Sequence, residues 1–109
     1  MISKTPDPPY YAVIFTSLRT GGDKGYDKTA NRMVELAQKQ KGFLGLETAR
    51  SEVGITVSYW KSLKDIQNWK DNVAHIKAQQ NGKEKWYTAY KVRICTVEHD
   101  YEFFRDNNF

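Results

Sequence analysis

The sequence predicts an α+β domain in which two helices cover one face of a four-stranded antiparallel sheet. Three observations support this prediction: four segments are rich in β-branched, aromatic and alternating apolar residues, two segments repeat apolar residues at helical spacing, and polar or glycine-rich turns separate the segments. The length of 109 residues is enough for one core but too short for two. We therefore expect an irregular arm over residues 1–9, one domain over residues 10–104 and a short tail over residues 105–109.

The expected elements follow one another along the chain with short connections. They are a strand over residues 10–18, a helix over 26–40, a hairpin of strands over 43–50 and 55–60, a helix from 63 to about 72, and a strand over 90–97. Residues 73–82 can add a second helical piece, and Glu84 to Ala89 can form one more turn. The order strand, helix, strand, strand, helix, strand is the ferredoxin-like βαββαβ arrangement.

Two local signals mark the ends of the helices. Ser62 stands just before the second helix and Asp65 follows three residues later, which is a short form of the capping box. Gly42 follows the first helix, where a glycine that ends a helix is typical. These signals place the helices on the chain without any knowledge of the packing.

The second face of the sheet needs a partner. Several of the expected strands carry apolar residues on both faces, whereas the helices can cover only one of them. A homodimer joined sheet to sheet would bury the other face, so we expect a dimeric α/β barrel. The aromatic tail, with Tyr101, Phe103 and Phe104, is also expected to dock on a surface.

The composition excludes several classes of function. The net charge of +4 is interleaved with carboxylates along the chain, which does not favour nucleic-acid binding. No apolar run is long enough to span a membrane, and we expect a cytoplasmic protein. Cys95 is the only cysteine, so an internal disulfide is impossible, and the two histidines lack the spacing of a metal site.

Two linked segments carry a resemblance to a known family. The first has the pattern GxxxSYWxSLxDIxxWK from Gly54, and the second has the pattern NxxHxxAQxxGxxxWYxxYxxRIxxVExDYEF from Asn72. In this spacing, and over about residues 10–103, the chain resembles the antibiotic biosynthesis monooxygenase family of the dimeric α+β barrel superfamily. The resemblance implies a ferredoxin-like protomer, a homodimer, and a cavity between the sheet and the helices of each protomer.

The resemblance also implies a reaction. Characterised members of the family oxidise polycyclic aromatic substrates with molecular oxygen, without metal or flavin. The chain is therefore expected to be a cofactor-independent monooxygenase for a small aromatic or quinol-type molecule. The alternative is a dimeric barrel that binds a small hydrophobic ligand, or serves in a stress response, without turnover. Fold membership alone leaves open whether the protein is an enzyme.

A heme-degrading branch of the same family is a minor alternative. That branch has a histidine ten positions after a tryptophan, where it binds iron. Here Gln79 stands ten positions after Trp69 and Lys70 ten positions after Trp60, and neither side chain replaces a neutral imidazole as axial ligand. The asparagine expected on the first strand is also absent.

His75 is the candidate catalytic residue, because an imidazole can accept a proton from an acidic phenol near neutral pH. A structural histidine that bridges the helix and the backbone is the competing interpretation. The candidate substrate pocket consists of Trp60, Asn72, Trp86, Tyr87 and Arg93. The large rings can equally belong to the core, and Arg93 can pair with Glu47 or Glu98 across the sheet or the dimer.

Overall fold

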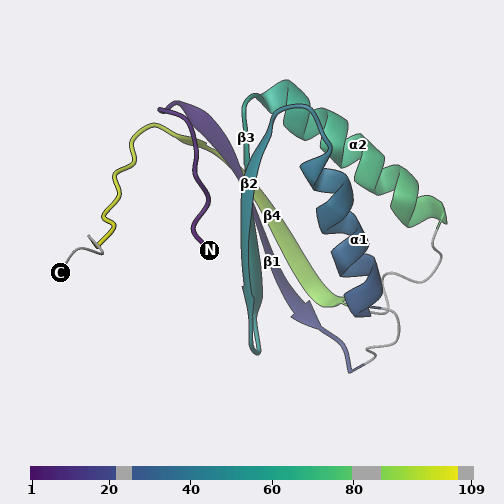
Figure 1. Ribbon diagram of the computed structural model, residues 1–109. Helices are drawn as coiled ribbons and strands as arrows, with labels where there is room; N and C mark the ends of the chain where they lie inside the picture. The colour runs from purple at the N-terminus through teal and green to yellow at the C-terminus, as the bar shows by residue number, and fades with distance from the viewer. Residues whose placement is uncertain (22–25, 80–86, 106–109) are drawn as a thin grey trace.

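The protein is represented by a computed structural model that describes residues 1–21, 26–79 and 87–105, with the backbone alone described for residues 74–79. The elements are β1 (Tyr10–Arg19), α1 (Tyr26–Gln38), β2 (Phe43–Arg50), β3 (Gly54–Trp60), α2 (Leu63–Gln79) and β4 (Tyr87–Val97). The strands form one sheet in the order β2-β3-β1-β4, and every neighbouring pair is antiparallel. Both helices lie on the same side of the sheet (Figure 1). The predicted ferredoxin-like βαββαβ fold is confirmed.

Two of the expected boundaries are wrong. The second helix is one continuous element to Gln79, with no break after Asn72. No glycine or proline interrupts the sequence from Leu63 to Gln79, so nothing in the chain forces the helix to end earlier. The turn expected over Glu84 to Ala89 is also wrong for its described part, because Tyr87 to Ala89 already pair with β1. The rest of that turn lies outside the described residues.

Cross-strand pairing divides the sheet into a helix face and an open face. Residues directly opposite each other on neighbouring strands share a face, and successive residues alternate. Trp60 stacks on Trp69 of α2, and its partner on β1 is Tyr11. The odd-numbered residues of β1 therefore belong to the helix face, and the even-numbered residues, beginning with Tyr10, belong to the open face.

The closed core lies at one end of the helix face. Trp60 has an exposed fraction of 0%, and Ile66 of α2 and Ala37 of α1 are buried as well. The ring of Phe43 meets Trp60 edge-on at 5.4 Å, and the ring of Trp69 stacks on it at 6.1 Å between centroids. The buried indole of Trp60, in contact with rings of β2 and α2, therefore joins the sheet to the helix layer.

A capped helix start closes this same end. The amide of Asp65 donates to Ser62 Oγ at 3.1 Å, and the Ser62 hydroxyl donates to Asp65 Oδ2 at 2.8 Å, which confirms the predicted cap. Gly42 has a φ of +83°, a left-handed conformation that favours glycine. A Cβ at Gly42 would also overlap the carboxylate of Asp65, so the turn after α1 and the cap of α2 fit together only with glycine at this position.

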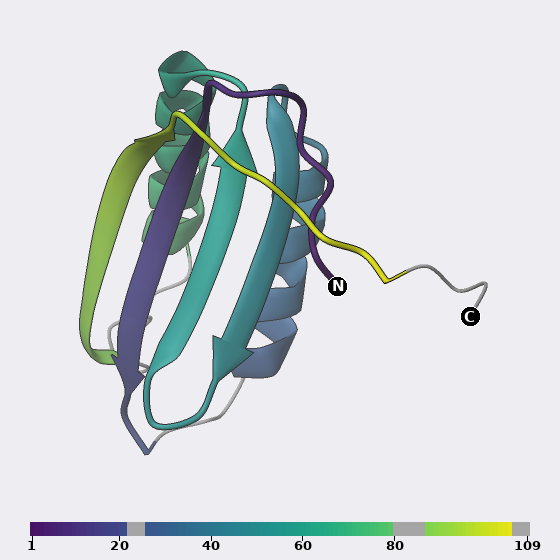
Figure 2. The same cartoon turned by 90° about the vertical axis from the view of Figure 1, so that its left-hand side faces the viewer.

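The open face is crossed by both ends of the chain (Figure 2). The Ser3 amide and the Tyr59 hydroxyl both donate to Glu47, at 2.9 and 2.6 Å. These two hydrogen bonds, the one from Tyr59 first, hold the pKa of the Glu47 carboxyl below its usual range. The Tyr10 hydroxyl donates to Asp100 at 2.5 Å and so holds the start of the tail.

The aromatic tail does not dock further on its own chain. Tyr101 has an exposed fraction of 99%, and Phe103 and Phe104 are exposed as well.

Cys95 also lies exposed on the open face, opposite Ala12. None of the described helices is long and apolar enough to cross a bilayer.

Candidate functional site

Four rings meet at the other end of the helix face, and we call them the aromatic cluster: Phe15, Tyr26, Tyr87 and Tyr90. Phe15 contacts Tyr87 edge-on at 5.6 Å and Tyr90 at 5.4 Å, and Tyr87 contacts Tyr90 at 5.9 Å between centroids. Tyr26, the first residue of α1, meets Tyr87 edge-on at 5.9 Å. The cluster therefore joins β1, β4 and the start of α1.

An irregularity between β1 and β4 creates this cluster. Tyr87 and Tyr90 are three positions apart, so a regular strand would place them on opposite faces. The register shifts between Leu18 and Arg19: Tyr90 pairs with Ser17, whereas Tyr87 pairs with Arg19. Both partners belong to the helix face, and the extra residue in β4 thus brings both tyrosines to that face.

The aromatic cluster continues into an accessible apolar wall along β4. On the helix face, Tyr90, Val92 and Ile94 have exposed fractions of 54%, 47% and 48%. Their partners on β1 are Ser17, Phe15 and Val13. Apolar side chains on the helix-covered side of a sheet are usually buried, so this half of the helix face offers contact area to a bound molecule.

Two guanidinium groups lie beside the aromatic cluster. Arg19 Cζ lies 3.7 Å from the ring centroid of Tyr26, and Arg50 Cζ lies 5.9 Å from the same centroid. Arg50 donates from Nη2 to Ser17 Oγ, although the two residues are on strands separated by β3. It reaches across Gly54, where a Cβ would overlap the guanidinium. The missing side chain at Gly54 therefore sets the position of Arg50.

Two of the three phenols of the cluster are linked, because Tyr87 Oη donates to Tyr26 Oη at 3.3 Å. Burial is the main factor that raises the pKa of Tyr87, and the hydrogen bond to Tyr26 raises it further. The charges of Arg50 and Arg19 act in the opposite direction on this pKa without reversing the shift. Near neutral pH the site therefore combines the neutral phenol of Tyr87 with two guanidinium cations.

The structure separates the residues predicted to form a pocket. Tyr87 belongs to the aromatic cluster. Trp60 is on the same face but fully buried at the opposite end, where its indole Nε1 donates to Ser58 Oγ at 2.9 Å. Asn72 lies exposed on α2 and donates to Gln40 Oε1 at 3.1 Å, which ties α2 to the turn after α1.

Arg93 lies on the other side of the sheet. It pairs with Ile14 and is exposed on the open face, away from Tyr87 and Trp60. Glu47 stands on the same face, in register with Val57 and Ile14. Because β3 and β1 lie between Glu47 and Arg93, an ion pair between these two side chains within one chain is excluded.

Two of the predicted site residues are not tested by the structure. The backbone of His75 belongs to α2, but its side chain is not described, and Trp86 lies outside the described residues. The catalytic role of His75 stays a prediction. Over the described part of the chain, no three His, Cys, Asp or Glu side chains gather as metal ligands.

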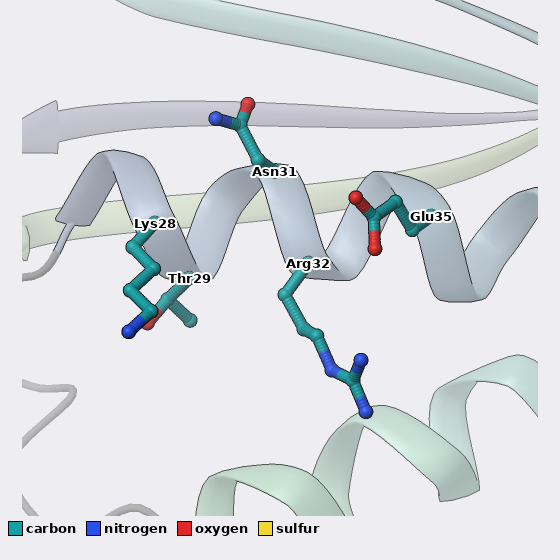
Figure 3. Close-up of a pocket in the computed structure, with 5 residues that line it drawn as sticks. All are labelled: Lys28, Thr29, Asn31, Arg32 and Glu35. Carbon is teal, nitrogen blue, oxygen red and sulfur yellow. The ribbon is translucent and has the colours of Figure 1, made fainter.

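Apart from the aromatic cluster, a hollow of about 540 Å³ lies along α1. It is lined by Lys28, Thr29, Asn31, Arg32 and Glu35. Arg32 points toward α2 in Figure 3. Lys28, Arg32 and Glu35 form a stripe on the side of α1 opposite the buried Ala37. This hollow is therefore an outer, polar groove, separate from the apolar wall between the layers.

Sequence patterns did not identify most residues of the aromatic cluster and its arginines as site residues. Phe15 and Tyr90 are ordinary strand residues by pattern, and Arg50 and Gly54 read as the flanks of a hairpin turn. The usable signal was the pair of tyrosines in the second resemblance pattern, but only the register shift shows that they share a face.

No protein-family profile matches the sequence. The chain is 47% identical over 109 residues to the uncharacterized protein YqjZ of Bacillus subtilis (strain 168). The alignment covers 98% of this chain and 96% of that protein.

Several solved structures share the fold. SnoaB, a cofactor-independent oxygenase from Streptomyces nogalater, superimposes with a TM-score of 0.67 at 11% identity, over 85% of this chain and 97% of that chain. A candidate antibiotic biosynthesis monooxygenase from Chloroflexus aurantiacus J-10-fl has a TM-score of 0.62 at 16% identity, over 85% and 97% of the two chains. A MhuD variant with two manganese protoporphyrin IX molecules per active site has a TM-score of 0.62 at 20% identity, over 85% and 99%. At these identities the likeness concerns the fold.

Proposed function

This chain belongs to the family of YqjZ, and we propose that it is a cofactor-independent monooxygenase of the antibiotic biosynthesis monooxygenase type, acting on a small aromatic or quinol-type molecule. One observation carries the proposal: an accessible aromatic and apolar wall lies on the helix face of a fold that a cofactor-independent oxygenase shares. The rings of Phe15, Tyr87 and Tyr90 offer both faces and edges to a flat ligand.

The proposed reaction takes its electrons from the substrate. A quinol or anthrone loses a proton to give an anion, and this anion transfers electrons to molecular oxygen. For an anthrone, the CH₂ group and O₂ give a carbonyl group and water. For a hydroquinone, one oxygen atom replaces the hydrogen of a ring C–H as a hydroxyl group, the quinol becomes a quinone, and the second oxygen atom leaves as water. Atoms and electrons balance in both cases without a further reductant. The protein holds the ring and stabilises the anion, which two guanidinium groups near the cluster favour. His75 is the proposed proton acceptor.

Oxygen uptake tests the proposal. Purified protein is mixed with a series of hydroquinones and anthrones in an oxygen electrode, and wild type is compared with His75→Ala and Tyr90→Ala. We expect one O₂ consumed per substrate oxidised, a fall of about 10²-fold or more in His75→Ala, and weaker substrate binding in Tyr90→Ala. Lys64→Gln, on the exposed start of α2, is the control.

Two results would replace this proposal. Saturable binding of the same compounds without oxygen uptake would make the protein a ligand-binding module. A Soret band that appears on titration with hemin and disappears in His75→Ala would favour the heme-degrading alternative.

We further propose that the open face pairs with a second copy of this chain. Ile55 and Leu18 are exposed on it, and the tail presents exposed rings nearby. In addition, Glu47 lies on the edge strand β2 and Arg93 on the opposite edge strand β4, both on the open face. A two-fold related sheet can therefore bring Arg93 of one copy toward Glu47 of the other.

Light scattering at micromolar concentration is expected to give the mass of a dimer, and a monomer would contradict the sheet-to-sheet arrangement. Alkylation of Cys95 supplies a local test. This thiol is exposed on the open face of the single chain, so it should react slowly in the dimer and faster on dilution.

A further inference from the structure

Two arginines, Arg19 and Arg50, lie beside the aromatic cluster at the hairpin end of the sheet, and Gly54 makes room for one of them. Arg50 crosses the bare backbone of Gly54 and donates to the buried Ser17 hydroxyl. The guanidinium of Arg19 lies over the ring of Tyr26. Both cations approach the same ring, at 3.7 and 5.9 Å from its centroid, and that ring touches Tyr87 of the cluster.

The position of Arg50 is set by contacts and by sterics. An arginine on an exposed strand end is ordinarily free to point into solvent, at a considerable gain in rotamer freedom. Here the guanidinium instead fills the space that a side chain at position 54 would occupy, and Gly54 is buried beneath it. A guanidinium carries five N–H donors, and Ser17 accepts from one of them.

We propose that Arg50 and Arg19 form an anion subsite, and that the ligand of the aromatic cluster is a small aromatic carboxylate whose ring lies on Phe15, Tyr87 and Tyr90. This inference rests on the ligand site of the proposed function and adds the chemical class of the ligand. A planar guanidinium fork matches the two oxygens of a carboxylate, so Arg50 and Arg19 supply the groups that would hold the anion. Val92 and Ile94 of the apolar wall would contact the rest of the ring system.

Direct binding tests the subsite without any turnover. The full-length protein is titrated in a calorimeter under nitrogen with 2-naphthoate and, as a neutral analogue of similar shape, with 2-naphthalenemethanol. We expect naphthoate to bind at least about tenfold more tightly than the alcohol, as for a hydrogen-bonded charge pair. We also expect this preference to shrink at high salt.

Four variants locate the anion. Arg50→Gln should remove the preference for naphthoate and leave the alcohol unaffected, whereas Arg50→Lys should retain part of it. Gly54→Ala keeps Arg50 in the chain, but the added methyl group occupies the space of its guanidinium and displaces it. This variant should therefore bind naphthoate more weakly, while its melting temperature stays close to that of wild type. Arg32→Gln removes the same group from the outer groove along α1 and should change nothing.

The outcomes are distinct. Equal affinity for naphthoate and the alcohol, or loss of binding in Arg32→Gln but not in Arg50→Gln, would overturn the anion subsite. An unchanged naphthoate affinity in both Arg50→Gln and Gly54→Ala would do the same. Conversely, Arg50-dependent naphthoate binding together with no oxygen uptake from any quinol would sustain the subsite while refuting the monooxygenase proposal.

Discussion

The two ends of the helix face carry similar numbers of aromatic rings, but the rings differ in their exposure to solvent. At one end Phe43, Trp60 and Trp69 pack into a core in which Trp60 has no exposed surface. At the other end the aromatic cluster stays partly open, and Tyr90 has an exposed fraction of 54%. Ring content therefore does not distinguish a core from a site.

The surroundings of each end make the difference. The Trp60 end is closed by the cap of α2 and by the turn at Gly42, and Trp60 itself meets only other protein atoms. The cluster end has two cations and a pair of hydrogen-bonded phenols beside its rings. Charged groups beside exposed rings are typical of a surface that binds a ligand, whereas fully buried rings contribute to stability.

The largest expected contrast is in stability. Trp60→Ala should lower the free energy of unfolding by about 3–5 kcal/mol, because it opens a cavity in the closed core. Tyr90→Ala removes a half-exposed ring and should cost about 1 kcal/mol. Urea unfolding at one fixed protein concentration measures both, and Trp60→Phe serves if the alanine variant fails to fold. Equal losses would show that the cluster belongs to the core.

The two glycines give the second contrast. Gly42→Ala combines a left-handed φ with overlap on the capped Asp65, and should cost about 1–3 kcal/mol. Gly54→Ala meets only the flexible end of Arg50, and should change the free energy of unfolding by less than about 1 kcal/mol. Thermal melts of the two variants compare them directly. A large loss for Gly54→Ala would mean that Arg50 holds the fold rather than a ligand.

The cap of α2 gives a smaller effect at the closed end. Ser62→Ala removes the acceptor of the Asp65 amide and the donor to its carboxylate, and should cost about 1 kcal/mol. Ligand binding at the cluster should be unchanged, because the cap lies at the far end of the sheet. Chemical denaturation together with a naphthoate titration checks both statements, and a loss of affinity would contradict the independence of the two ends.

The smallest effect concerns alkaline pH. The folded state raises the pKa of Tyr87 above its usual value of 10.0, mainly through burial. The contribution of this shift to stability is therefore complete below pH 10 and is lost as the pH rises above it. Tyr87→Phe should make the fall in stability above pH 10 less steep. Melting temperatures across the alkaline range measure this, and parallel curves for the two proteins would refute it.

The pattern of the sequence was sufficient for the order of the elements. Alternation located β1, β2 and β3 within one residue at each end, and Ser62 marked the start of α2. The end of α2 and the start of β4 were missed, since no residue in the chain marks either of them. For β4, local periodicity cannot locate the first residue, because that residue is set by pairing with the distant strand β1.

The candidate site was less accessible to prediction. Of the five residues expected in the pocket, Tyr87 lies in the aromatic cluster, Trp60 is buried in the core and Arg93 lies on the open face. The faces of these strand residues depend on their register with β1 and β3, and this register is a property of the whole sheet.

By itself the sequence determined a ferredoxin-like protomer, the capped start of α2 and an abundance of rings. Only the tertiary structure decided which rings form a core and which form a site. The register shift in β4 turned Tyr87 and Tyr90 to the same face, and the empty space over Gly54 brought Arg50 to Ser17. Both results depend on contacts between residues far apart in the chain, whereas helix and strand patterns depend on near neighbours.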